Sequence, residues 1–327
     1  MDKAKSANKF MLFLLLYIMA LPLIAMPIVF VLTLCGVSED LQGQLLLFFQ
    51  HFLCFGIPLA FLKVSKNVDI LSLIPHKRLN GKNILLIIAI QLCFTPVMYL
   101  MAAISNVFFE NDTSDVIMQY MDSVPFWVLF MAVAVFAPIF EEVVFRGVIF
   151  SGFKKEKLWV GVLISSLYFG IMHLNAQQFL YATVAGLVLA IVVHYTESIY
   201  ASIIVHFFVN GGQLFMAKLA TAFFPAANVS SDLITMEEKL LLVKVCAGWT
   251  VLTLPMLAVA LSYFINYNKQ RLEDEALENE PDEELDIILL REEKKTAFDK
   301  FFWLVIVFYL VYMIGEALLG EALSSVL

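Results

Sequence analysis

The sequence is poor in charge, and this scarcity excludes most soluble proteins. Asp, Glu, Lys and Arg make up 15% of the 327 residues, against about 25% in ordinary soluble domains. The net charge of −8 does not describe the whole chain, because the acidic residues are concentrated in one segment, 273–299. Lys and Arg are sparse and follow the edges of apolar runs, so we expect no binding to nucleic acid.

Cysteine is scarce as well, and its spacing excludes two further classes. The four cysteines lie in or beside apolar runs, and none belongs to a CxxC pair: Cys35, Cys54, Cys93 and Cys246. This spacing supports neither a disulfide framework nor a zinc cluster. We expect these four side chains to serve in packing.

Long apolar runs dominate the rest of the chain, which is 61% hydrophobic with a mean hydropathy of +0.86. A membrane-spanning helix needs roughly 20 predominantly apolar residues. Candidate runs lie at 10–34, 45–62, 84–108, 126–150, 159–174, 179–195, 199–217, 240–265 and 301–325. The sequence therefore predicts an integral membrane protein with an all-α, polytopic helical bundle, formed by about eight core transmembrane helices and one C-terminal helix. The first run is longer than a signal-peptide core of about 7–15 residues, so we expect it to be a span.

Charge in the connections predicts the orientation. The N-terminus and segments 63–83 and 151–158 are basic, whereas the connections between them are acidic. Basic connections stay in the cytoplasm, so we expect a cytoplasmic N-terminus, and the short connections favour a bacterial cell membrane. The expected division is N-terminal transmembrane helices (1–119), a catalytic core (120–217), an eighth-helix region (218–265), an acidic cytoplasmic linker (266–300) and a C-terminal transmembrane helix (301–327).

Ionisable side chains stand inside the fourth predicted span, where burial in lipid costs at least about 2.5–3.5 kcal/mol per charge. The run APIFEEVVFRGVIF contains Glu141, Glu142 and Arg146. Glu142 and Arg146 are spaced i,i+4, so they share a helix face and can pair. Glu141 points about 100° away and is expected to stay chemically available, as a general base must.

Two further spans add imidazoles and an amide. Phe169 and His173 are i,i+4 in one span, and His206 and Asn210 are i,i+4 in another. Counted from the basic ends, Glu141 lies about 20 Å deep and His173 about 21 Å. Asn210 lies about 17 Å deep and His206 about 11 Å. Independent stray residues would scatter more widely, so we expect one buried polar site that opens to the cytoplasm.

Each of these residues also has a purely structural interpretation. A lone His or Asn in a span often serves only in hydrogen bonds between helices, and a Glu–Arg pair is often structural. The joint pattern favours function. His51, beside Gln50 in the second span, has no partner in the pattern, and we give it little weight as a site residue.

In chain order the signals are EExxxR (Glu141, Glu142, Arg146), FxxxH (Phe169, His173) and HxxxN (His206, Asn210). This set, within about residues 120–217, resembles the CPBP family of intramembrane proteases. That family includes the type II CAAX prenyl endopeptidases and bacteriocin-immunity-like membrane proteins. The resemblance implies hydrolysis of a peptide bond at the membrane, so the expected partners are membrane lipid and a peptide or protein substrate.

The resemblance also implies roles for the matched residues. The candidate catalytic residues are Glu141, Glu142, His173, His206 and Asn210, with Arg146 and Phe169 in support. Glu141 and His173 would activate a water molecule. His206 and Asn210 would polarise the scissile carbonyl and hold the oxyanion, while Glu142 and Arg146 would position the Glu141 backbone.

The cofactor requirement stays open at this point. One Glu with two His is a ligand set of catalytic zinc sites, so Glu141, His173 and His206 are the candidates for a divalent metal such as zinc. Glu142 would then have to act as the base although it can pair with Arg146, and no HExxH helix is present. We favour a metal-free glutamate mechanism.

Two other functions are compatible with buried polar groups. A proton-coupled transporter or channel would use them as an ion relay, but the outer halves of the fourth and fifth spans are nearly pure apolar. A non-catalytic membrane scaffold or immunity protein would keep the fold without the chemistry. Degenerate motifs would support the scaffold, whereas all three are intact here.

Overall fold

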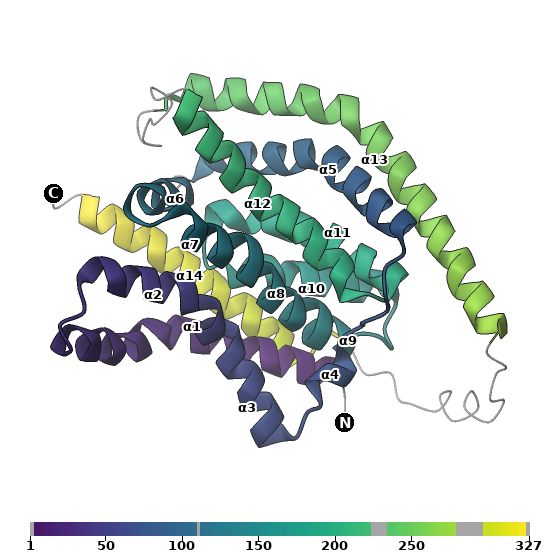
Figure 1. Ribbon diagram of the computed structural model, residues 1–327, viewed down its shortest axis with the longest axis horizontal. Coiled ribbons are helices and arrows are strands. Elements are labelled where there is room, and N and C mark those ends of the chain that lie inside the picture. Colours follow the sequence, from purple (N-terminus) through teal and green to yellow (C-terminus); the bar gives the residue numbers. More distant parts are fainter. Residues whose placement is uncertain (1–2, 110–111, 224–233, 279–296, 325–327) are drawn as a thin grey trace.

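A bundle of long helices makes up the computed structural model, which describes residues 3–109, 112–223, 234–278 and 297–324 (Figure 1). Among these residues, eight helical segments are long and apolar enough to cross a membrane. They are α1 (Lys3–Leu34), α2 to α3 (Glu39–Lys66), α5 (Gly81–Phe108), α7 to α9 (Phe126–Gly152), α11 (Ala176–Thr196), α12 (Ile199–Phe223), α13 (Met236–Glu278) and α14 (Lys300–Ser324). The predicted polytopic helical fold is confirmed.

The remaining predicted span, 159–174, is the shorter helix α10 (Leu158–Met172). Its 15 residues reach about 22 Å, less than the roughly 30 Å of a hydrocarbon core. The connection that follows contains Leu174, whose φ of 48° lies in the left-handed region. Asn175 then caps α11, because its side-chain oxygen accepts a hydrogen bond from the Gln178 N–H at 2.9 Å.

Helices α10 and α11 pack closely because two glycines lie between them. A Cβ atom on Gly186 would stand 2.8 Å from the Ser166 Cα, and one on Gly170 would stand 2.8 Å from the Phe179 carbonyl oxygen. Both distances are shorter than a carbon atom tolerates. Any larger residue at these positions would push the two helices apart.

Two spans are interrupted by π-helical turns, which occur frequently at functional sites. In the second span, α2 (Glu39–His51) passes through η1 (Phe52–Gly56) into α3 (Ile57–Lys66). The fourth span consists of α7 (Phe126–Phe130), η2 (Met131–Phe136), α8 (Ala137–Glu142), η3 (Val143–Ile149) and α9 (Phe150–Gly152). The two adjacent glutamates therefore lie on a short α-helical piece between two π turns.

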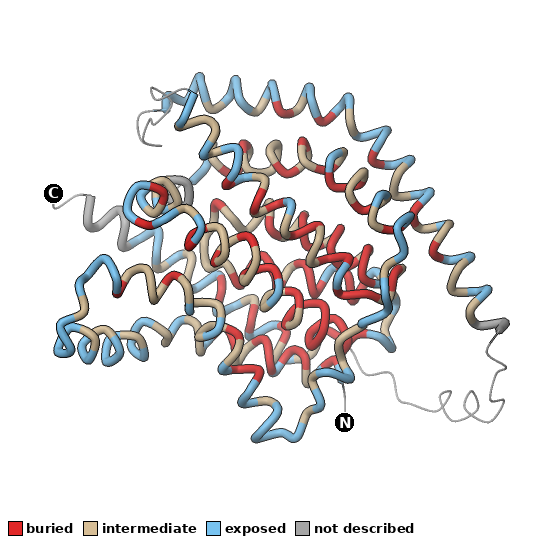
Figure 2. Tube along the Cα trace, in the orientation of Figure 1, coloured by how far each residue is buried: buried red, intermediate tan, exposed pale blue. Residues whose placement is uncertain are grey.

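The buried residues gather in the middle of the bundle, around α8, α10, α11 and α12, whereas the peripheral helices are largely exposed (Figure 2). Helix α13 lies along α5, and α14 lies along α1 (Figure 1). Their outer faces present large apolar side chains, among them Leu241, Val251, Leu252, Val259, Val307 and Leu310. Exposed apolar surface of this extent marks contact with lipid in a membrane protein.

Segment 63–83 contains the short helix α4 (Ile70–Leu73) and is fastened by one lysine. The Lys77 Nζ lies 2.6 Å from a Glu197 carboxylate oxygen and 2.7 Å from a Glu275 carboxylate oxygen. The hydrogen bond to Glu197, followed by that to Glu275, raises the pKa of Lys77 above its usual value. This network ties three separate parts of the chain together at the end of the bundle with the basic connections.

The segment predicted as an acidic linker, 266–300, begins inside a helix. Helix α13 continues to Glu278, where Arg271 and Glu275 form an i,i+4 ion pair at 3.2 Å. Leu, Glu and Ala dominate this stretch and are strong helix formers. Residues 279–296 of the predicted linker lie outside the described residues.

Candidate active site

The fourth span buries a glutamate–arginine pair completely. The Arg146 Nη1 donates to a Glu142 carboxylate oxygen at 3.0 Å, and both side chains are inaccessible to solvent. The Arg146 Nη2 donates to the Gly186 carbonyl oxygen at 3.2 Å, and the guanidinium lies 4.5 Å from the centroid of the Phe169 ring. The pairing predicted from the i,i+4 spacing is therefore present.

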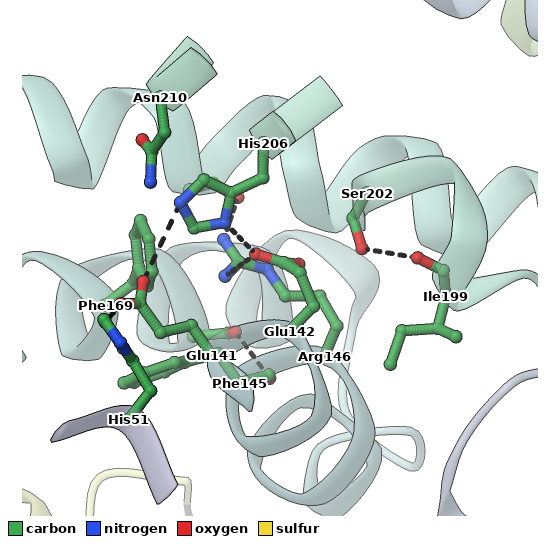
Figure 3. Close-up of polar contacts among 12 residues, drawn as sticks. His51, Glu141, Glu142, Phe145, Arg146, Phe169, Ile199, Ser202, His206 and Asn210 are labelled. Carbon is green, nitrogen blue, oxygen red and sulfur yellow. Dashed lines mark hydrogen bonds and ion pairs between the residues drawn. The ribbon is translucent and has the colours of Figure 1, made fainter. Parts of the chain in front are cut away.

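Glu142 also holds an imidazole that is 64 residues away in the sequence. Its Oε1 lies 2.9 Å from the His206 Nδ1 (Figure 3). A carboxylate accepts, so the Nδ1 carries the proton of this hydrogen bond. The ring orientation of His206 is consequently set by Glu142, and its Nε2 is turned towards Glu141.

Glu141 lies between two imidazoles. One of its oxygens is 3.8 Å from the His206 Nε2, and the other is 3.8 Å from the His51 Nε2 (Figure 3). The Glu141 side chain is 13% exposed, unlike that of its neighbour Glu142. Glu141 is thus the accessible carboxylate of the pair, as the sequence predicts.

His51 is a site residue that none of the three motifs predicts. It stands at the end of α2, next to the π turn η1, and points towards Glu141 (Figure 3). Its Nδ1 is buried and has no hydrogen-bond partner among the described residues. The available signal was a lone histidine inside an apolar span, which by itself is uninformative because no charged or amide side chain lies one helical turn away in the sequence.

The FxxxH and HxxxN motifs converge on the same place. The His173 Nδ1 lies 2.8 Å from the Phe169 carbonyl oxygen, which leaves the Nε2 for other partners. The Phe169 ring stands edge-on to both imidazoles, with centroids 5.0 Å from His173 and 5.5 Å from His206. The Asn210 side chain donates to the Val133 carbonyl oxygen at 2.9 Å. All three predicted helices therefore contribute to one site.

This site forms the wall of a cavity of about 730 Å³. Five of the seven motif residues line the cavity: Glu141, Phe169, His173, His206 and Asn210. Glu142 and Arg146 lie behind this wall. Side-chain amides provide much of the remaining polar lining, namely Gln50, Asn106, Gln177, Gln178 and Gln213.

The cavity does not extend towards the end with the basic connections, where the sequence analysis expects the opening. The cavity is lined by Ile117 and Met118 of α6 (Asp112–Ser123), by Asn106 near the end of α5, and by Ala220 near the end of α12. These residues belong to the opposite end of the bundle. No lining residue comes from the basic segments 63–83 or 151–158 in the described part of the chain. The cavity reaches from the middle of the bundle to the end with the acidic connections.

The candidate metal ligands do not fit a metal site in this arrangement. Among the residues that the structure describes, no three His, Cys, Asp or Glu side chains are placed so that they could hold a metal ion. The Nδ1 hydrogen bonds of His206 and His173 leave both Nε2 atoms available, so the placement of the side chains, and not their hydrogen bonding, is what fails to suit a shared ion. We therefore derive no chemical step through a metal.

The fold and the site together define a polytopic membrane protein with a glutamate and three histidines around a cavity inside the helical bundle. Residues 123–212 match the family described as "Type II CAAX prenyl endopeptidase Rce1-like". The part of the chain that contains the three motifs is therefore similar to the family that these motifs resemble.

Two curated proteins are similar over the same part of the chain. The candidate membrane peptidase YdiL of Bacillus subtilis (strain 168) is 29% identical over 102 residues, which cover 31% of this chain and 41% of YdiL. The UPF0177 protein YaiH of Lactococcus lactis subsp. lactis (strain IL1403) is 35% identical over 85 residues, which cover 26% of this chain and 35% of YaiH. The chain thus spans less than half the length of either relative. No solved structure matches it at a significant level.

Proposed function

We propose that this protein is an intramembrane endopeptidase that hydrolyses a peptide bond in a membrane-associated substrate. One observation carries the proposal. Glu141 is an accessible carboxylate at the wall of a cavity within the bundle, and imidazole nitrogens stand 3.8 Å from each of its oxygens. This arrangement lies in a domain that matches a peptidase family.

The spacing between Glu141 and His206 suits a nucleophilic water molecule. A separation of 3.8 Å between the Oε2 and the Nε2 is too long for a direct hydrogen bond. A water oxygen at about 2.8 Å from both atoms would stand about 2 Å to the side of the line that joins them. Attack by this oxygen on the scissile carbonyl carbon transfers the water proton to Glu141. Glu141 then returns a proton to the amine nitrogen as the C–N bond breaks.

The remaining cavity residues stabilise the oxyanion and assist the water. The His206 Nε2, which faces Glu141, keeps its contact with the attacking oxygen as this atom bonds to the carbonyl carbon. Asn210 is held by Val133 through one amide hydrogen and keeps a second hydrogen for the oxyanion. His173 lines the same cavity, and its proposed role is to assist the attacking water. Each fixed donor of this kind is worth roughly 10²–10³ in kcat.

Glu142 and Arg146 act as positioning residues in this mechanism. Both are fully buried, and neither lines the cavity. Glu142 orients His206 through the 2.9 Å hydrogen bond, while Arg146 supplies the compensating charge. The side-chain amides of the cavity wall suit an uncharged polypeptide segment, because they both donate to and accept from a peptide backbone.

The direct test compares membrane-associated peptides in cells that produce the native protein with those that produce Glu141→Gln. The matched control is Glu39→Gln, the same change at an exposed glutamate at the start of α2. We expect peptides that depend on Glu141 and are unaffected by Glu39→Gln. Identical peptide profiles for the native protein and Glu141→Gln would favour the non-catalytic scaffold.

A further inference from the structure

The two ends of the bundle differ in charge and in access to the site. Among the Lys and Arg residues in the described part of the chain, Lys218, Lys239 and Lys244 alone belong to the end that contains α6. One more, Arg146, lies in the site. The other Lys and Arg residues that the structure describes lie in or beside the segments at the opposite end, which are the N-terminus, 63–83, 151–158, 269–271 and Lys300. Such an asymmetry retains the basic end in the cytoplasm.

The cavity extends towards the other end. On α12, Ala220 lies ten residues beyond Asn210, about 15 Å farther along the helix axis, and still lines the cavity. Leu242 of α13 and Met118 of α6 also line the cavity. Helix α6 lies across the bundle and is seen nearly end-on in Figure 1, whereas the long spans lie roughly in the plane of the picture. The cavity therefore extends from Glu141 towards the side on which α6 lies.

A smaller groove of about 220 Å³ adjoins the cavity between α5 and α12. The two share Met98, Tyr99, Val209, Gln213 and Met216. The groove is also lined by Leu92 and Phe208, which are 68% and 43% exposed on the lipid-facing surface. An apolar segment in the surrounding lipid would thus lie next to the cavity.

From these observations we propose that the active site is reached from the extracytoplasmic side of the membrane. The substrate class is an exported or membrane-inserted polypeptide whose scissile segment is presented on that side, next to an apolar stretch that stays in the lipid. The substrate class rests on the proposed peptidase function, whereas the side of access rests on the extent of the cavity and on the distribution of Lys and Arg along the chain. A C-terminal tail that is made and modified in the cytoplasm does not fit, because no described part of the cavity reaches the basic end.

Thiol labelling in intact cells tests the side of access without requiring catalysis. The background is the full chain with its native cysteines replaced by serine, at Cys35, Cys54, Cys93 and Cys246. Single cysteines are then introduced as Met118→Cys in the cavity wall and Lys66→Cys at the end of α3 in the basic end. A variant that retains only Cys35, which is exposed at the end of α1, is the positive control.

The probe is a charged methanethiosulfonate reagent that does not cross membranes. We expect Met118→Cys and the Cys35 control to react in intact cells, and Lys66→Cys to react only after permeabilisation. Reaction of Lys66→Cys in intact cells overturns the orientation. Failure of Met118→Cys to react in intact cells, whether or not it reacts after permeabilisation, overturns the opening at this end.

The substrate class is tested by the positions of the cleavage sites. Peptides that depend on Glu141 should end in segments located outside the cytoplasm and next to apolar stretches of exported or membrane proteins. Termini in cytoplasmic tails overturn the substrate class. Adding Glu141→Gln to the labelling variants should leave labelling unchanged. If the peptide profiles show no dependence on Glu141 while the labelling pattern holds, the peptidase proposal fails and the extracytoplasmic opening stands.

Discussion

The buried charges of Glu142 and Arg146 should be tolerated in the fold only when both are present. The substitution Arg146→Met tests this expectation, because it removes one of the two charges. The substitution keeps an unbranched side chain but leaves the Glu142 carboxylate without its cation, inside a site with no solvent access. Removing one partner of a buried ion pair costs about 3–5 kcal/mol. At about 2 °C per kcal/mol for a chain of this size, the melting temperature should fall by roughly 6–10 °C.

Removing both charges should recover most of this loss, because an apolar or neutral pair in the same volume is often as stable as the ion pair. Two double variants separate stability from chemistry. Glu142→Gln with Arg146→Met keeps an oxygen that can accept from the His206 Nδ1, whereas Glu142→Leu with Arg146→Met does not. The hydrogen bond from Arg146 to Gly186 is lost in every variant, so the comparison isolates the unpaired carboxylate.

The assays are thermal unfolding of the purified protein in detergent and cleavage of a peptide identified in the cellular comparison. Both double variants should melt above Arg146→Met. Cleavage should persist with glutamine and fall by roughly 10²–10³ with leucine, because His206 is then no longer oriented. The reasoning is refuted if Arg146→Met melts within about 2 °C of the native protein, or if neither double variant is more stable than the single one.

Four further outcomes are expected. His51→Ala should lower kcat with little change in KM, because His51 faces Glu141 rather than the bound chain; a rise in KM alone would contradict this role. Cleavage by the purified protein should survive prolonged treatment with a metal chelator, and a loss that added zinc restores would sink the metal-free mechanism. Gly186→Ala should destabilise the protein by about 1–3 kcal/mol, since its Cβ meets Ser166; unchanged melting would show that the helices can separate freely. Lys77→Ala should lower the free energy of unfolding by at most about 1 kcal/mol. The stabilisation by Lys77 should be fully present below the ordinary pKa of lysine and vanish as the pH rises through its raised pKa. Thermal unfolding at several pH values measures this dependence.

Contacts that are local in sequence were predictable, and contacts between distant spans were not. The Glu142–Arg146 pair follows from helix periodicity, and the structure contains it. The 2.9 Å hydrogen bond between Glu142 and His206 joins two spans whose relative rotation no periodicity specifies. His51 approaches Glu141 beside a π turn, and such turns change which side chains face the bundle without a marked sequence signature. The sequence therefore predicts which helices meet but not which atoms do.

The direction in which the cavity extends was likewise not predicted, although the depth of Glu141 in its span contains information about it. Counted from the basic end, Glu141 is about 20 Å deep in a core of roughly 30 Å, so the opposite surface is the nearer one. Helix α10 explains how a cavity can form there. It covers only about 22 Å, and its chain turns at His173 to Asn175 before reaching that surface. Non-helical backbone at this depth is tolerated where it lines a water-filled cavity. The shortness of α10 thus has two consequences. It leaves space for the cavity beyond the end of the helix, and it places the His173 imidazole in the cavity wall.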